Sequence, residues 1–129
     1  MNRIELPYRP NPANQPIVYV FLRGPERSLT AGMLVDSGAD SSVIPWSLGI
    51  HLGFRETAEE HVRTVTGIGG GIQVRPRRLQ MTLGAAGPEL EIETLWAAVE
   101  TPVLLGRKGI FDRFRVEFDQ RAGKLRFSP

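Results

Sequence analysis

Cysteine is absent from this sequence, and histidine occurs only twice. Without thiols the chain forms no disulfide, binds no metal through thiolates and uses no thiol as a nucleophile. His51 and His61 stand alone and lack the spacing of metal ligands. The sequence therefore predicts neither a metal site nor a cofactor.

Long apolar runs are absent as well. The longest, such as residues 18–22, are far too short to cross a bilayer. The first residues lack the apolar core of a signal peptide. We therefore expect a soluble, unexported chain that works in the cytoplasm and has no membrane partner.

A large excess of charge is also missing, since 16 basic and 14 acidic residues give a net charge of +2 at pH 7. The isoelectric point of about 9.5 overstates the basicity, because little titrates between the carboxylates and the lysines. Nucleic-acid binding would need a clustered basic patch. The candidate is the arginine cluster within residues 75–78, which we expect on a solvated strand face, paired with the glutamates of residues 89–93.

The composition that remains is that of one globular domain. Its 129 residues are 41% hydrophobic and 23% charged, enough for a core but too few for two complete enzyme domains. Residues 1–16 carry four prolines and are predicted to form an extended arm. Residues 17–129 are predicted to form the domain.

Short strands dominate the predicted secondary structure. They are expected at residues 17–22, 28–35, 61–66, 72–83 and 90–99, with a hairpin over 115–127. One short helix is expected from Pro45 to about Gly53, and one or two helical turns over 109–114. Within residues 72–83, the apolar residues lie at even positions up to Pro76 and at odd positions from Leu79 onward. The apolar side chains therefore change from one face of the strand to the other, which predicts a bulge or a bend. The fold class is therefore a single mostly-β domain.

The strongest chemical signal is the segment Asp36-Ser-Gly-Ala-Asp40, which follows an apolar strand. A carboxylate at the end of a buried strand is costly unless neighbouring groups hold its charge. Ser37 offers a hydroxyl donor, and Gly38 lets backbone amides approach the carboxylate. The same residues are also common in turns, so this segment alone fits a turn and an active site equally well.

Two further segments favour an active site. Residues 67–71 are four glycines and one isoleucine, a hairpin tip suited to closing over an extended ligand or simply a glycine-rich loop. Arg107 directly follows the apolar run of residues 103–105 and a glycine. An arginine there is either a surface residue or the partner of a carboxylate.

These three segments, in this order, resemble the retropepsin family of aspartic proteases, which contains the retroviral proteases and their bacterial relatives. The resemblance spans residues 33–118 and implies a barrel-like acid-protease domain. It identifies Asp36 as the catalytic residue and Ser37, Gly38 and Ala39 as the active-site loop. It also implies a structural ion pair between Asp40 and Arg107.

By the same resemblance, the glycine-rich tip is the flap that covers the substrate. Its residues are Gly67, Ile68, Gly69, Gly70 and Gly71. Apolar positions that line substrate pockets, or belong to the core, are Val35, Ala39, Val43, Ile68, Ile72 and Leu104.

Aspartic proteases need two carboxylates that share one proton. The chain has a single Asp-Ser-Gly, and Asp112 and Asp119 lack its glycine and apolar strand. The second catalytic carboxylate is therefore expected from Asp36 of another copy, in a two-fold homodimer that hydrolyses peptide or protein substrates. Ser37 stands where the retroviral enzymes commonly have threonine, and the two ends of the chain differ from the retroviral termini, which interleave in the dimer.

Two other functions remain open at this stage. The first is a non-catalytic module of the same fold that holds an extended peptide. The second, less favoured, is nucleic-acid binding through the arginines. The substrate, the cleavage preference, the pH optimum, the strength of the dimer and any processing from a precursor are left open by the sequence.

Overall fold

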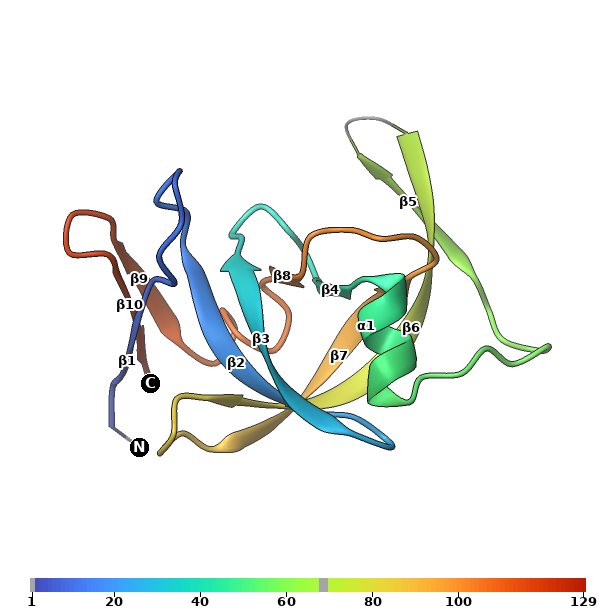
Figure 1. Ribbon diagram of the computed structural model, residues 1–129, viewed down its shortest axis with the longest axis horizontal. Helices are drawn as coiled ribbons and strands as arrows, with labels where there is room; N and C mark the ends of the chain where they lie inside the picture. The colour runs from blue at the N-terminus through green and yellow to red at the C-terminus, as the bar shows by residue number, and fades with distance from the viewer. Residues whose placement is uncertain (1, 68–69) are drawn as a thin grey trace.

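The computed structural model describes residues 2–67 and 70–129, and it is mostly β (Figure 1). The strands are β1 (Ile4–Pro7), β2 (Ile17–Arg23), β3 (Ser28–Val35), β4 (Ser42–Ile44), β5 (Arg63–Gly67), β6 (Gly70–Leu83), β7 (Glu89–Ala97), β8 (Leu104–Leu105), β9 (Arg115–Asp119) and β10 (Lys124–Ser128). One helix lies among them, α1 (Trp46–Leu52). The predicted mostly-β class is confirmed. Residues 109–114 form turns, in which the Phe111 and Phe114 N–H groups donate to the carbonyls of Arg107 and Ile110 as in a helical turn.

The main sheet closes on itself. Its strand order is β2-β3-β8-β4-β7-β6-β5, and β2 also pairs with β6. The strands from β2 to β6 in this order therefore form a ring around the core, and the β5 end of the β5–β6 hairpin stands out from the body (Figure 1). A smaller sheet, β1-β10-β9, pairs the two ends of the chain with each other.

Strand β2 shows why the sequence folds in this way. Val18, Val20 and Leu22 are fully buried inside the ring, whereas Tyr19 and Phe21 face outward. This period of two places every second side chain in the core. Within residues 2–67 and 70–129, no helix is long and apolar enough to span a membrane.

Helix α1 is fixed by Trp96 of β7. The Trp96 ring stacks on Trp46 at 4.6 Å, and its Nε1 donates a hydrogen bond to the Trp46 carbonyl at 3.2 Å. Gly49 makes this approach possible, because a Cβ there would lie 2.2 Å from Trp96 Nε1. Gly53 ends the helix with a φ of 104°, a conformation that favours glycine.

Of the bulge or bend predicted for β6, the bulge is wrong. The pairing of β6 with β7 is continuous from Val74 to Thr82, with no extra residue on either strand. The apolar pattern is interrupted because Arg75 and Arg77 lie on the same inward side of β6 as Leu79, at positions where apolar residues would be expected. The solvated face predicted for the arginine cluster is therefore also wrong for these two residues, and only Arg78 is exposed there, paired with Glu91.

Arg75 and Arg77 reach the segment between α1 and β5. Arg77 donates two hydrogen bonds to the Glu60 carboxylate, at 2.6 and 2.9 Å, and its guanidinium lies 5.1 Å from the centre of the Trp96 ring. Arg75 pairs with Glu60 at 3.2 Å and with Glu56 at 2.9 Å. This Glu60 clamp, made of Glu60, Arg75 and Arg77, fastens residues 54–62 to the base of the hairpin.

Replacement of Glu60 by glutamine is expected to lower the free energy of unfolding by about 1–3 kcal/mol near pH 7, because it removes charge-assisted hydrogen bonds. The hydrogen bond from Arg77 lowers the pKa of Glu60 from 4.5 to about 2. A lowered pKa in the folded state means that the stabilisation is complete above about pH 4.5 and disappears as the pH falls through about 2. Urea denaturation of both proteins from about pH 7 to about pH 2 tests this. A difference between them that stays constant over this range would contradict the prediction.

Candidate active site

Asp36 lies where β3 leaves the barrel. The Asp36 N–H donates to the Leu105 carbonyl at 3.0 Å, which extends the pairing of β3 with β8 by one residue. Its side-chain Oδ1 accepts a hydrogen bond from the Gly38 N–H at 2.8 Å. Within the described residues, the other oxygen of the half-buried carboxylate receives no hydrogen bond. Asp36 thus has a fixed orientation and one oxygen available for chemistry.

The loop that carries Asp36 rests directly on residues 106–108. Arg107 N–H donates to the Ala39 carbonyl at 2.9 Å, and Lys108 N–H donates to the Asp40 carbonyl at 2.9 Å. Gly106 N–H donates to the hydroxyl of Ser42, which is fully buried, at 3.0 Å. These contacts join segments more than sixty residues apart, as the separation of 64 between Ser42 and Gly106 shows.

The Arg107 side chain crosses the same loop. Its guanidinium donates to the Ser37 carbonyl at 2.8 Å and forms an ion pair with Asp40. Asp40 is 88% exposed and Arg107 is 47% exposed. The bond to the Ser37 carbonyl therefore contributes more to holding the loop than the solvent-screened ion pair does.

This difference predicts unequal effects of two substitutions. Asp40→Asn is expected to change the free energy of unfolding by less than about 0.5 kcal/mol, because exposed ion pairs contribute little. Arg107→Met removes both the ion pair and the charged group that donates a hydrogen bond to the Ser37 carbonyl. It is expected to lower the free energy of unfolding by about 1–2 kcal/mol. Urea denaturation of the two variants measures both, and an equal or larger loss for Asp40→Asn would contradict the ranking.

The other predicted site residues lie around this loop. Ser37 and Gly38 are exposed and Ala39 is half-buried. A Cβ at Gly38 would lie 3.2 Å from Asp36 Oδ1, so the short distance to the carboxylate suits a glycine. Of the apolar positions proposed for pockets, Val35 belongs to the core, and Ala39, Val43, Ile72 and Leu104 are half-buried.

The glycine-rich tip forms the end of the β5–β6 hairpin. Thr66 pairs with Gly71 and Gly67 pairs with Gly70, which has a φ of 110°. Ile68 and Gly69, also predicted for the flap, lie outside the described residues. In the part of the chain that the structure describes, no group of three or more acidic or histidine side chains is close enough to hold a metal ion.

Two features of the structure were not predicted from the sequence. One is Ser42, whose buried hydroxyl supports Gly106, although nothing in the sequence distinguishes it from Ser41. The other is β1, which pairs with β10 and brings the proline-rich segment against the domain. Its short alternation was hidden by the neighbouring prolines.

The closed sheet carries a carboxylate at the end of β3, and comparison with solved structures identifies the fold. A retropepsin-like aspartic protease from Rickettsia conorii is 19% identical, with 98% of each chain covered and a TM-score of 0.70. The EIAV protease in complex with the inhibitor HBY-793 is 22% identical, with 77% of this chain and 88% of that chain covered and a TM-score of 0.56.

These likenesses show that the chain has the fold of the retropepsin-like aspartic proteases. The resemblance drawn from the three sequence segments is thereby confirmed at the level of the fold. No protein-family model matches the sequence, and no curated protein matches it either.

Proposed function

We propose that this chain is an aspartic endopeptidase of the retropepsin type, active as a homodimer with Asp36 as the one catalytic residue of each copy. The observation that carries the proposal is the state of Asp36. Its carboxylate stands at the end of β3, is oriented by the Gly38 N–H, and has one oxygen without a hydrogen-bond donor among the described residues. The fold in which it stands is that of aspartic proteases.

The chemistry needs two such carboxylates about 3 Å apart, sharing one proton because both cannot be ionised at that separation. The ionised carboxylate takes a proton from a water molecule, whose oxygen attacks the carbonyl carbon of the peptide bond. The protonated carboxylate donates its proton to the carbonyl oxygen. Collapse of the tetrahedral intermediate then breaks the C–N bond. The leaving nitrogen takes the proton that was removed from water, and a hydroxyl of the intermediate returns its proton to the other carboxylate, so that the pair again holds one proton.

A second copy supplies the second carboxylate in this proposal. The exposed loop residue Ser37 is available to a partner copy beside Asp36. The terminal strands β1 and β10 pair within one chain, unlike the interleaved termini of the retroviral dimers. The dimer contact is therefore assigned to the active-site loops and to the edge strands β1 and β9 of the small sheet.

The β5–β6 hairpin serves as the flap. Its backbone N–H groups near Gly70 and Gly71 would bind the carbonyl groups of an extended peptide, and the Glu60 clamp fixes its base. The clamp would persist in moderate acid, because the pKa of Glu60 is lowered to about 2 by the Arg77 hydrogen bond. Carboxylate dyads typically titrate between about pH 1.5 and 4.7, so the clamp and a working dyad are compatible.

One observation favours a second function. Because β1 and β10 are already paired within the chain, the dimer loses the strand pairing used by the retroviral enzymes and is expected to be weaker. A chain that stays monomeric would have no dyad and would act as a peptide-binding module.

Cleavage of an unstructured protein by the wild type and by Asp36→Asn, between about pH 3 and 7, separates the two functions. Cleavage that is lost in the variant supports the protease. Binding without cleavage, unchanged in Asp36→Asn, supports the binding module.

A further inference from the structure

Residues 98–103 connect β7 to β8, and we call them the β7–β8 linker. At one end of the linker, the Ala98 N–H donates to the Gln73 carbonyl of β6 at 2.9 Å. At the other end, the Val103 carbonyl accepts the Leu34 N–H of β3 at 2.8 Å, two residues before the reactive carboxylate. The linker thus runs from the β5–β6 hairpin to the strand that carries this carboxylate (Figure 1).

The middle of the linker is bonded to the start of α1. The Trp46 N–H donates to the Val99 carbonyl at 3.2 Å. The Ser47 N–H donates to Oε2 of Glu100 at 2.9 Å, and the Ser47 hydroxyl donates to Oε1 of the same carboxylate. One side chain of the linker therefore binds both donors of Ser47 through charge-assisted hydrogen bonds.

Helix α1 receives from Glu100 a cap that its own sequence does not provide. Pro45 stands at the N-cap position and has no polar side chain, and the first turn contains no acidic residue. Glu100 supplies the missing acceptor from another part of the chain. The hydrogen bonds from the Ser47 hydroxyl and N–H lower the pKa of Glu100, so its carboxylate stays ionised at a lower pH than that of an ordinary glutamate.

Helix α1 is a firm support for the linker. Trp46 of the helix stacks on the fully buried Trp96 of β7 at 4.6 Å. The same Trp96 ring is contacted by the Arg77 guanidinium of the Glu60 clamp, at 5.1 Å. A shift of α1 would disturb this packing, so the helix keeps its place. The linker is therefore tied, through α1, to the residues that fasten the base of the hairpin.

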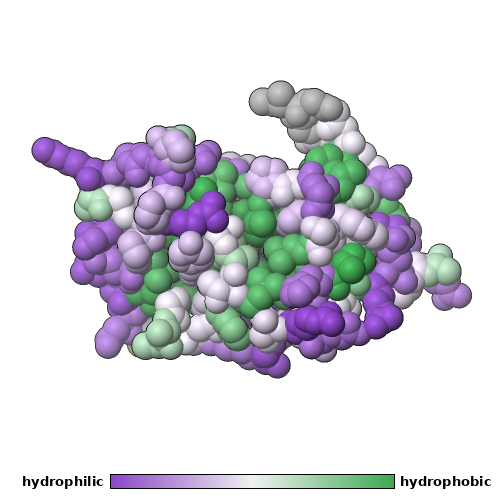
Figure 2. Space-filling model, viewed as in Figure 1, coloured by the Kyte–Doolittle hydropathy of each residue, from purple (hydrophilic) through white to green (hydrophobic). Residues whose placement is uncertain are grey.

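The neighbours of Glu100 in the linker do little to fix its position. Val99 is 50% exposed, and Pro102 is exposed as well. The Thr101 hydroxyl donates only to the carbonyl of Pro102 beside it, at 3.0 Å. Figure 2 shows hydrophobic surface just below the β5–β6 hairpin on this face of the molecule. Because these apolar side chains face solvent instead of the core, the middle of the linker is positioned by its hydrogen bonds to α1.

We propose that Glu100 is a positioning residue for substrate binding, because its carboxylate fixes the β7–β8 linker on α1 and so holds the β5–β6 hairpin in place relative to the loop of Asp36. This inference rests on the proposed function and adds to it a residue that acts through the linker. In that function an extended peptide lies between the hairpin and the loop, so a linker that moves weakens binding of the peptide.

The chemical step should be less sensitive to Glu100 than binding is. Asp36 is oriented by its own bond to the Leu105 carbonyl and by the Gly38 N–H. Both bonds remain when the Glu100 carboxylate is removed. Loss of the Glu100 bonds is therefore expected to change KM much more than kcat.

Glu100→Ala is expected to raise KM for a cleaved peptide about 5- to 10-fold, while kcat stays within about twofold. Glu100→Gln is the conservative variant, because its amide can accept the Ser47 N–H and donate to the Ser47 hydroxyl oxygen. It should restore most of the wild-type KM. A KM of Glu100→Ala equal to that of the wild type, or a rise that Glu100→Gln does not reduce, would overturn the inference and leave the protease function standing.

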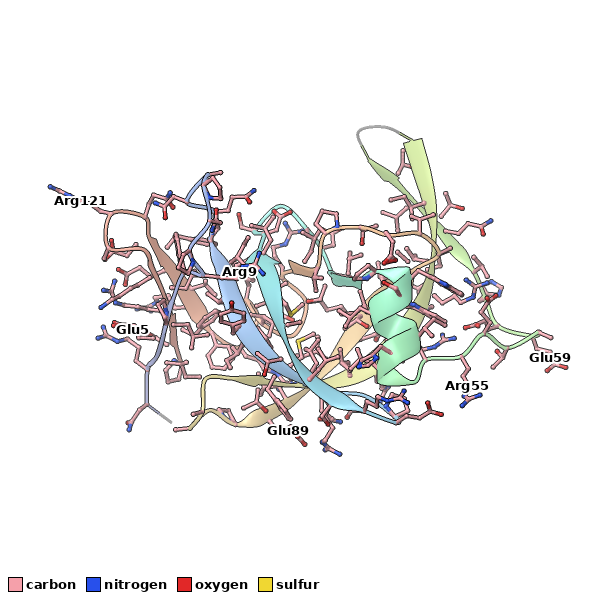
Figure 3. The ribbon with its side chains drawn as sticks, viewed as in Figure 1. Glu5, Arg9, Arg55, Glu59, Glu89 and Arg121 are labelled. Atoms are coloured by element: carbon pink, nitrogen blue, oxygen red, sulfur yellow. The ribbon has the colours of Figure 1, made fainter. Side chains whose placement is uncertain are left out.

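Glu89→Ala is the matched control for a general loss of stability. Glu89 is the first residue of β7, at the opposite end of that strand from the linker (Figure 3). Its exposed carboxylate also accepts two hydrogen bonds, both from Arg23. Glu89→Ala thus removes a comparable pair of bonds and should leave KM unchanged. An equal rise of KM in Glu89→Ala and Glu100→Ala would contradict the proposal.

Amide hydrogen exchange, followed by NMR, gives a readout that needs no cleavage. The amides of Ala98 and Leu34 report on the two ends of the linker, because they donate to the Gln73 and Val103 carbonyls. Both amides should exchange about 5- to 10-fold faster in Glu100→Ala than in the wild type, and at the wild-type rate in Glu89→Ala. Exchange that is the same in all three proteins would overturn the inference.

Failure of the proposed function would give a different result. If the wild type cleaves no peptide, the protease assignment is wrong, and the affinity for a fluorescent unstructured peptide, measured by anisotropy, takes the place of KM. Glu100→Ala should then bind this peptide about 5- to 10-fold more weakly than Glu89→Ala does. Equal affinities of the two variants would overturn the role of Glu100 as well.

Discussion

Asp36→Asn is expected to lower kcat/KM for peptide cleavage by about three to four orders of magnitude while leaving the fold unchanged. An amide cannot take a proton from water near neutral pH and cannot share a proton with a facing carboxylate. The fold survives because asparagine keeps an Oδ1 that accepts the Gly38 N–H hydrogen bond. A fluorogenic peptide measures the loss, and circular dichroism with the melting temperature measures the fold.

Asp112→Asn is the matched control for this prediction. It makes the same chemical change at an exposed aspartate whose contact is the Gly109 N–H of its own turn. Cleavage by Asp112→Asn should remain close to that of the wild type. Full activity of Asp36→Asn would contradict the assignment of the catalytic residue.

A mixture of the wild type and Asp36→Asn tests whether two copies of the chain share one pair of catalytic carboxylates. If each active site needs Asp36 from both copies, equal amounts of wild type and Asp36→Asn give about one quarter wild-type dimers after exchange. Activity should then be about one quarter of that of the same total amount of wild type. An activity of one half would mean that each chain works alone.

Gly106→Ala is expected to have the largest effect on stability, with a loss of about 3 kcal/mol. A Cβ at this position would lie 2.4 Å from both the carbonyl carbon and the oxygen of Ser41, and 2.9 Å from the Ala39 carbonyl oxygen. All three are backbone atoms, so no side-chain rotation relieves the clash. The loop of Asp36 must move, and cleavage should fall with stability.

Gly123→Ala separates this clash from the general cost of replacing glycine. Gly123 has a φ of 65°, but nothing lies within 4 Å of a Cβ there. Its replacement should cost about 1 kcal/mol, from the left-handed backbone alone. Urea denaturation compares the two variants. A Gly106→Ala loss no greater than that of Gly123→Ala would contradict the tight contact beneath the loop.

Much of the barrel could be predicted from local patterns. The β-branched and aromatic residues of 17–22 and the apolar residues before Asp36 predict β2 and β3 closely. In the structure each of these two strands buries one side and exposes the other. Gly53 likewise predicts the end of α1, since only a residue tolerant of positive φ ends the helix in this way.

The arginines were harder to place. Arg75 and Arg77 occupy inward positions of β6, where the sequence predicted a change of face. Their placement depends on Glu60, Glu56 and the ring of Trp96. These partners lie far from the arginines in the sequence, so no local sequence pattern predicts the contacts.

The candidate site likewise contains some residues that the sequence predicts and others that it does not. The Asp36-to-Asp40 segment was recognisable because its own residues carry the chemistry and the turn. By contrast, the support from Ser42 and the position of Arg9 over Gly32 depend on contacts between separate elements. A single sequence marks neither residue.

The sequence by itself determined the absence of thiol chemistry, the mostly-β class, and the single Asp-Ser-Gly that makes a second copy necessary for an aspartic dyad. These properties follow from composition and from interactions between near neighbours. Only the tertiary structure decided that β1 pairs with β10 within one chain, that Gly106 lies beneath the loop of Asp36, and that Arg9 lies over Gly32 of β3. The physical reason is that closure of the barrel through the β2–β6 pairing brings distant segments within contact distance, and hydrogen bonds and ion pairs depend on that distance.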